Sequence, residues 1–229
     1  MSEAPLYLKI ADLSVEIDGW DMPTGAMRRF FADGDAADRT PDLKLTFTHS
    51  EEEEDWLRLH RLLSEALIDR DVLLFHASAV ALDGEGYAFT APSGTGKSTH
   101  SALWKSCFGD RLSYVNDDKP FLVFRGNQVY VAGSPWMGKH GLGGNVTVPL
   151  RGIAVLKQAV ENRISKLDPV EAYTALLQQV FLPPTRERTE KVLSLLERAV
   201  TGVPCYRLEC TPDARAVETA SAAMRRNRQ

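Results

Sequence analysis

The chain has 229 residues, which is enough for one domain of ordinary size or for two small ones. Hydrophobic residues make up 44% and charged residues 25%, a globular composition that argues against wholesale disorder. A net charge of −4 disfavours binding to nucleic acid or to an anionic membrane, and no apolar run reaches the ~18 residues of a membrane span.

The first fifty residues predict a small β unit that packs on the rest of the chain. Apolar residues alternate over 6–17, as in two short strands, and again over 43–48. The segment between them, 18–41, contains glycine and proline and is expected to be a connection. The residue pattern changes near residue 50, so we place a domain boundary there: residues 1–50 form the β unit and residues 51–229 form the main domain.

A helix is predicted to begin at Ser50. This serine can cap the free N–H groups of the first turn, and Glu53 lies where it would complete a capping box. We expect His49 and His60, on either side of the helix start, to lie at the surface. One apolar face follows at helical spacing, made by Trp56, Leu59, Leu63, Ala66 and Leu67.

From residue 72 onward the pattern becomes that of an α/β protein. Helices dominate the last third: Asp168 is expected to cap one to about residue 180, Thr185 to open another to about residue 200, and Thr211 to cap a C-terminal helix. The fold class is therefore α/β, with a mixed (α+β) sheet and a helical C-terminal part. Short apolar runs predict the strands of a central sheet at 72–75, 77–82, 87–90, 112–115, 121–124, 129–132, 153–156, 164–167 and 203–208.

The most informative segment is APSGTGKST, residues 91–99, which matches a P-loop with Ala91 in place of the first glycine. Gly94 and Gly96 let the backbone turn so that successive N–H groups converge on phosphate oxygens. Lys97 can reach the β- and γ-phosphates, and the Ser98 hydroxyl can bind Mg²⁺.

An apolar strand precedes this segment and a helix follows it, as phosphate binding requires. A flexible glycine and serine turn at the surface is the alternative interpretation. We predict that the domain binds a nucleoside triphosphate through seven consecutive residues: Ser93, Gly94, Thr95, Gly96, Lys97, Ser98 and Thr99.

Two acids follow the next predicted strand. Asp117 and Asp118 begin twenty residues after Lys97, where a neighbouring strand can bring them back to the loop. One carboxylate can hold Mg²⁺ and the other can accept a proton from an attacking hydroxyl, provided that the strand ends there, which Pro120 favours. An Asx-type turn without chemistry is the alternative. His76, at the end of an earlier strand, could orient one aspartate, although a core histidine is the other interpretation.

A glycine-rich connection over 133–145 is the third candidate. Long connections of this kind are usually functional or disordered. Lys139 and His140 are positioned to reach phosphate or substrate. Trp136 is expected either to cover a nucleotide or to pack beneath the loop.

Together these motifs resemble the HPr kinase/phosphorylase family, within the wider phosphoenolpyruvate-carboxykinase-like P-loop fold. The resemblance covers residues 72–158 and rests on His76, the 91–98 loop, the two aspartates, the 133–139 segment and the 149–153 strand. That strand contains Arg151, a further candidate for the phosphate or substrate site. Leu150 precedes it, where HPr kinases have a glutamate.

The resemblance implies a role for each matching residue. Asp117 would be the catalytic base toward the acceptor hydroxyl, assisted by His76, and Lys97 with the loop amides would hold ATP. Ser98 and Asp118 would bind Mg²⁺, with Asp117 as a further candidate ligand.

The sequence therefore predicts an ATP- and Mg²⁺-dependent kinase that transfers the γ-phosphate to a hydroxyl, expected to be a serine, of a small protein or peptide. Two alternatives stay open: a non-catalytic, nucleotide-dependent regulator, and a carboxykinase-like enzyme acting on a small acid. The expected partners are a serine-bearing acceptor and, from the resemblance, further copies of the chain, with no nucleic acid and no membrane. Cys107, Cys205 and Cys210 form no CxxC motif and are interpreted as reduced thiols, which predicts a cytoplasmic location.

Overall fold

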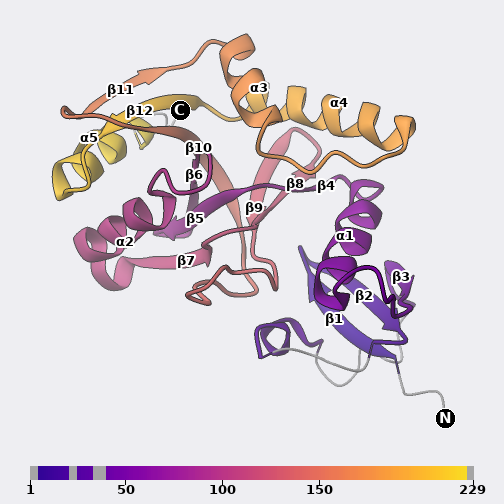
Figure 1. Cartoon of the computed structure of the whole chain (residues 1–229). Coiled ribbons are helices and arrows are strands. Elements are labelled where there is room, and N and C mark those ends of the chain that lie inside the picture. The colour runs from indigo at the N-terminus through magenta and orange to yellow at the C-terminus, as the bar shows by residue number, and fades with distance from the viewer. Residues whose placement is uncertain (1–4, 21–24, 33–39, 226–229) are drawn as a thin grey trace.

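The computed structural model describes residues 5–20, 25–32 and 40–225, and this part of the chain forms a mixed α/β fold with two sheets (Figure 1). In the smaller sheet, β1 (Leu6–Ile10) is antiparallel to β2 (Leu13–Asp18), and β2 is parallel to β3 (Leu43–Thr46). The three predicted N-terminal strands are thus confirmed. The connection between β2 and β3 is described only in part and includes a short 3₁₀ helix, η1 (Met27–Phe30).

Helix α1 (Asp55–Ile68) has Glu54 at its N-cap, four residues after the predicted cap Ser50, and no side chain caps it. The predicted capping box is wrong because both of its side chains have other partners. The Ser50 hydroxyl accepts a hydrogen bond from the Glu52 N–H at 3.2 Å, and the Glu53 carboxylate pairs with Arg61 at 2.9 Å. The predicted apolar face is buried against the small sheet, through Leu59, Leu63 and Leu67.

The larger sheet runs in the order β4-β8-β9-β10-β6-β5-β7, and β12 pairs with β10 and with β11. Strand β10 joins its two halves: its first residues pair antiparallel with β9, and the rest pairs parallel with β6 and β12. It includes both the strand predicted at 153–156 and the 149–153 strand of the resemblance, and it extends two residues beyond them at each end. The bounds are β4 (Val72–Leu74), β5 (Ala77–Leu82), β6 (Glu85–Thr90), β7 (Leu112–Asn116), β8 (Phe121–Arg125), β9 (Gln128–Ala132), β10 (Thr147–Gln158), β11 (Arg163–Lys166) and β12 (Cys205–Cys210).

Four further helices pack on this sheet, and the view in Figure 1 places α2 and α5 at the opposite end of the molecule from α1 and the small sheet. Asp168 caps α3 as predicted by accepting hydrogen bonds from the first-turn N–H groups, whereas α5 is capped by Asp213 rather than by Thr211. Within the described ranges, no helix is both long and apolar enough to cross a membrane. The bounds are α2 (Lys97–Phe108), α3 (Pro169–Leu177), α4 (Arg186–Gly202) and α5 (Ala214–Met224), with a 3₁₀ turn, η3 (Gly109–Arg111), after α2.

Most of the candidate site residues lie at one edge of the larger sheet. Strands β6, β7, β10 and β12 run in the same direction, while β5 lies antiparallel between β6 and β7. The ends of β6 and β7 therefore lie beside the start of β5. We call this the loop edge: it carries the 91–98 loop after β6, Asp117 after β7, and His76 just before β5.

Candidate functional site

The 91–98 loop connects β6 to α2 through two glycines in conformations that other residues rarely adopt. Gly94 has φ of 79°, and Gly96, the N-cap of α2, has φ of 113°. Lys97 is only 7% exposed, and its Nζ donates to the carbonyl oxygens of Ala91 at 2.9 Å and Pro92 at 3.4 Å. Burial is the main cause that lowers the pKa of Lys97, against the opposing charges of nearby carboxylates.

Asp117 is held in one orientation by two serines that the sequence analysis did not single out. Its side chain lies at the end of β7 and the residue is 5% exposed. The hydroxyls of Ser78, on β5, and Ser101, on α2, lie 2.7 and 3.3 Å from its Oδ1 atom. Its Oδ2 atom has no hydrogen-bond partner among the described residues, and the residue lines a cavity. One oxygen thus fixes the carboxylate while the other stays available.

Asn116 ends β7 and turns Asp118 toward the same edge. Its Oδ1 accepts hydrogen bonds from the backbone N–H groups of Asp118 at 2.8 Å and Lys119 at 2.7 Å. The predicted end of the strand at the two aspartates is confirmed, and it takes the form of an Asx turn. Asp118 accepts a hydrogen bond from Lys119 Nζ at 2.9 Å and lies 3.6 Å from Nε2 of His76.

His76 lies between β4 and β5, and one of its two ring nitrogens is hydrogen bonded. Its Nδ1 lies 3.1 Å from Oε1 of Gln179, and its backbone N–H donates to the carbonyl of the same residue. Burial is the largest cause that lowers the pKa of His76, followed by the positive charges of Lys119 and Lys97. A neutral ring that donates from Nδ1 to Gln179 leaves Nε2 unprotonated, 3.6 Å from Oδ1 of Asp118, where the carboxylate can stabilise a proton once the ring has taken one up.

A single cavity of about 560 Å³ brings these groups together. We call it the charged cavity. The residues of the glycine-rich loop that reach it are Gly138, Lys139 and His140, all exposed. Its other lining residues are His76, Ser93, Gly94, Gly96, Lys97, Ser98, Thr99, Asp117 and Asp118. Every candidate from the sequence analysis except Thr95, Trp136 and Arg151 therefore lines one space.

Arg151 lies at the other end of the sheet. The register of β10 against β6 pairs Leu150 with Gly86, at the start of β6, whereas the 91–98 loop follows the end of β6. The Arg151 guanidinium pairs with Glu85 at 3.2 Å, and its side chain is 51% exposed. The prediction that Arg151 joins Lys139 and His140 at the site therefore finds no support in its position.

The glycine-rich loop is anchored from the N-terminal part of the chain. Nη1 of Arg29, on η1, donates to the carbonyl oxygens of Gly141 at 3.0 Å and Gly143 at 2.7 Å. Asn145 donates to the carbonyl of Lys9, on β1, at 2.9 Å. These contacts join residues more than a hundred positions apart, so no local sequence signal could have identified them.

Trp136 packs beneath the loop, which is the second of its two predicted roles. Its ring is buried, with its centroid 4.5 Å from that of His60 and 5.1 Å from that of Trp56. The prediction that His60 lies at the surface is wrong, because the ring is largely enclosed between α1 and Trp136. Burial lowers the pKa of His60 to about 4.

The charged cavity also offers ligands that suit Mg²⁺. Within the described residues, no group of three or more His, Cys, Asp or Glu side chains could hold a metal ion by itself. However, Mg²⁺ in phosphate-transfer sites is commonly bound by one or two carboxylates together with phosphate oxygens and water. The available oxygen of Asp117, the Asp118 carboxylate and the Ser98 hydroxyl, all at one cavity, match that donor set.

Comparison with known proteins finds only distant likenesses, all of them to solved structures. No family model and no curated protein matches the chain. Among solved structures, the Hpr(Ser) kinase/phosphatase from Coxiella burnetii is similar with 14% identity and a TM-score of 0.37; the match covers 66% of this chain and 95% of that chain. A likeness of this strength establishes neither family nor activity, so the function has to be sought in the geometry of the site.

Proposed function

We propose that the protein is an ATP- and Mg²⁺-dependent phosphotransferase that moves the γ-phosphate to a hydroxyl, a serine of a small protein or peptide. The observation that carries this proposal is the charged cavity. In it, the glycine-rich start of a helix faces two carboxylates and a neutral histidine. Phosphoryl transfer needs this combination: donors for the phosphates, ligands for a metal ion, and a base near the acceptor.

The 91–98 loop binds and orients the triphosphate. The backbone N–H groups between Gly94 and Ser98 and the N-terminal end of α2 attract the phosphate oxygens. Lys97 contributes an ammonium that exchanges its contacts with two loop carbonyls for contacts with the β- and γ-phosphates. When bound, Mg²⁺ neutralises charge that develops on the phosphate oxygens, and Asp117 with Ser98 would hold it.

The acceptor proton goes to the pair formed by His76 and Asp118. The serine oxygen attacks the γ-phosphorus, the bond from that phosphorus to the bridging oxygen breaks, and the electron pair leaves with ADP. The hydroxyl proton moves to Nε2 of His76, and Asp118, 3.6 Å away, stabilises the resulting imidazolium. This assignment differs from the one implied by the resemblance, because Oδ1 of Asp117 is bonded to Ser78 and Ser101 and its other oxygen is assigned here to Mg²⁺.

Transfer from radiolabelled ATP to a library of serine-containing peptides and to small proteins of a cell extract tests this function. We expect label on serine with the wild-type protein and Mg²⁺, and none with Lys97→Met, which keeps a long apolar side chain but removes the ammonium. If the wild-type protein binds ATP but labels no serine acceptor, the kinase proposal fails.

A nucleotide-dependent regulator is the second candidate, favoured by the contacts of Arg29. They connect the N-terminal unit to the loop that lines the charged cavity, so a bound triphosphate could change the position of that unit. A carboxykinase-like enzyme has less support, since no arginine is among the described residues that line the cavity. A cytoplasmic location and self-association stay predictions.

A further inference from the structure

We infer that the nucleoside part of the phosphate donor binds in a second cavity, on the other side of the 91–98 loop, so that the donor is a nucleoside triphosphate rather than an inorganic polyphosphate. This inference rests on the proposed function. It adds the place where the base and ribose lie, which the P-loop pattern does not specify.

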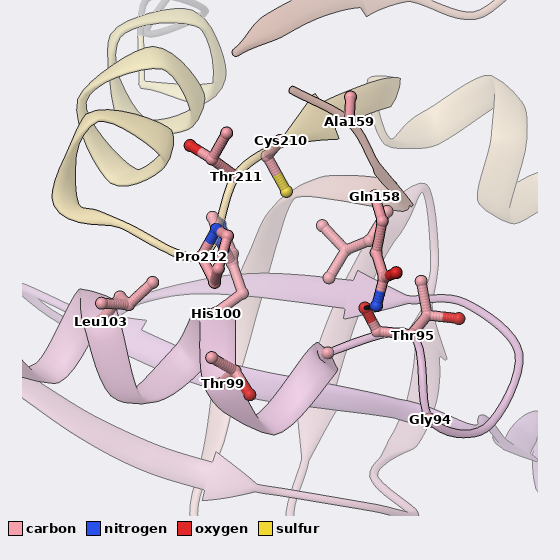
Figure 2. A pocket seen from close by; sticks show the side chains of 12 residues that line it. Gly94, Thr95, Thr99, His100, Leu103, Gln158, Ala159, Cys210, Thr211 and Pro212 are labelled. Atoms are coloured by element: carbon pink, nitrogen blue, oxygen red, sulfur yellow. Dashed lines mark hydrogen bonds between the residues drawn. The ribbon is translucent and has the colours of Figure 1, made fainter. Parts of the chain in front are cut away.

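The second cavity, which we call the apolar cavity, has a volume of about 410 Å³. It lies between α2, the end of β10 and the turn from β12 to α5. Figure 2 shows Cys210, Thr211 and Pro212 facing His100 and Leu103 of α2 across this space. Its volume lies within the range of ~300–1,000 Å³ typical of small-molecule sites.

The two cavities meet at the 91–98 loop. Gly94, Gly96 and Thr99 line both of them. A ligand that extends from one cavity to the other must therefore pass over the backbone of this loop and the first turn of α2. A triphosphate lying there would place its terminal phosphate beside Asp117 and Asp118 and its nucleoside end in the apolar cavity.

The walls of the two cavities differ in charge as such a ligand requires. Lys97, Asp117, Asp118 and Lys139 line the charged cavity. The described residues that line the apolar cavity include no Asp, Glu, Lys or Arg, and several are apolar: Leu103, Leu156, Ala159, Cys210 and Pro212. A flat, uncharged base suits these walls, because ligand sites are mostly apolar with a few placed polar groups.

His100 supplies one of those polar groups. The residue is 3% exposed, and its Nε2 accepts a hydrogen bond from Nε1 of Trp104 at 2.9 Å. Burial lowers the pKa of His100 to about 4, so the ring is neutral at pH 7 and carries its proton on Nδ1. The described residues provide no acceptor for this Nδ1–H, which leaves it as a donor for a ring nitrogen of a base or a ribose oxygen.

Hydrogen bonds hold the rim of the apolar cavity in place. The side chain of Gln158, at the end of β10, donates to the carbonyl of Thr95 at 3.2 Å and so ties the sheet to the loop (Figure 2). Across the cavity, Asn162 donates to the Thr211 hydroxyl at 2.8 Å and accepts from the Thr211 N–H at 3.0 Å. A rim fixed on both sides gives a preformed site, which lowers the cost of ordering on binding.

Calorimetric titration of the full chain with ATP and with inorganic tripolyphosphate, both with Mg²⁺, tests this inference. Ala159→Trp fills the apolar cavity, whereas Ala102→Trp places the same side chain at an exposed position of α2 that lines neither cavity. We expect Ala159→Trp to weaken ATP binding by about ten-fold or more and to change tripolyphosphate binding less than about two-fold. Ala102→Trp should leave both affinities unchanged.

Leu103→Ala is a second variant, which removes apolar contacts from the lining of the apolar cavity instead of filling it. We expect about a five-fold loss of ATP affinity and no change for tripolyphosphate, because only the nucleoside contacts this wall. Equal changes for the two ligands in both variants overturn the inference while leaving the proposed function intact. If the wild-type protein binds neither ligand, the proposed function itself fails, and the inference fails with it.

Discussion

The two edges of the larger sheet carry similar residue types in opposite surroundings. At the loop edge, Asp117 is almost buried and its carboxylate is hydrogen bonded to two serine hydroxyls. At the opposite edge, Asp83 pairs with Arg111 at 3.0 Å and Glu85 pairs with Arg151 at 3.2 Å, with the arginine side chains 58% and 51% exposed. The difference lies in the partners: buried hydroxyl groups hold Asp117, whereas half-exposed guanidinium groups hold Asp83 and Glu85.

This difference decides what each group can do. Exposed ion pairs contribute about 0–1 kcal/mol and are screened by salt, because water competes for both charges. A carboxylate held by buried donors keeps one geometry and acts in a medium of lower dielectric constant. We therefore expect conservative substitutions at the loop edge to lower the rate of phosphate transfer with little loss of folding stability. Substitutions at the opposite edge should change neither the transfer rate nor the free energy of unfolding appreciably.

The largest effect is expected for Asp117→Asn. The amide oxygen can still accept hydrogen bonds from Ser78 and Ser101, so the fold is retained, but the negative charge that would hold Mg²⁺ is lost. We expect the rate of phosphate transfer to fall by about 100-fold or more. The Mg²⁺ dependence of the rate, compared with that of wild type, is the measurement. A variant with an unchanged rate and an unchanged Mg²⁺ dependence would remove Asp117 from the site.

His76→Gln is expected to lower the transfer rate by about 100-fold through loss of the proton acceptor. The pKa of His76 lies below its ordinary value because of burial. Wild-type activity should therefore be constant at neutral pH and fall only at acid pH, where the ring takes up a proton. The pH profile of kcat should lose this acid limb in the variant. A profile of the same shape in both proteins contradicts the role of His76 as base.

Arg29→Ala is expected to have a moderate effect. The variant removes the two hydrogen bonds to the loop carbonyls, so the segment that presents Lys139 and His140 becomes more mobile. We expect the transfer rate to fall by roughly five-fold, since a loosely held loop positions substrate less well, together with faster hydrogen exchange over 138–145. Lys9→Ala, on β1 near the same loop, is the control because Lys9 contacts Asn145 through its backbone carbonyl only.

The smallest effect is expected for Arg151→Ala. Its ion pair with Glu85 is exposed and lies far along β10 from the loop edge. The free energy of unfolding should fall by less than about 1 kcal/mol, and transfer should change less than about two-fold. A large loss of transfer with unchanged ATP affinity would show that Arg151 acts on the acceptor after all, and the contrast between the two edges would no longer hold.

Local patterns determined the elements of this protein and the chemistry of its loop. Strand and helix periods identified most elements, and the spacing of Gly94 and Gly96 before Lys97 predicted the backbone turn that is observed. The two aspartates were placed at the end of a strand by Pro120. These features depend on residues that are close together in the sequence, so the sequence alone predicts them. The start of α1 was missed because competing partners of Ser50 and Glu53 decided it.

Only the tertiary structure determined which of these residues lie close together in space. His76 reaches Asp118 because β5 runs antiparallel between β6 and β7, and Gln179 holds its ring from more than a hundred residues away. The register of β10 against β6 places Arg151 at the far edge. Strand order and direction follow from the packing of whole faces, and residue periods carry no information about them.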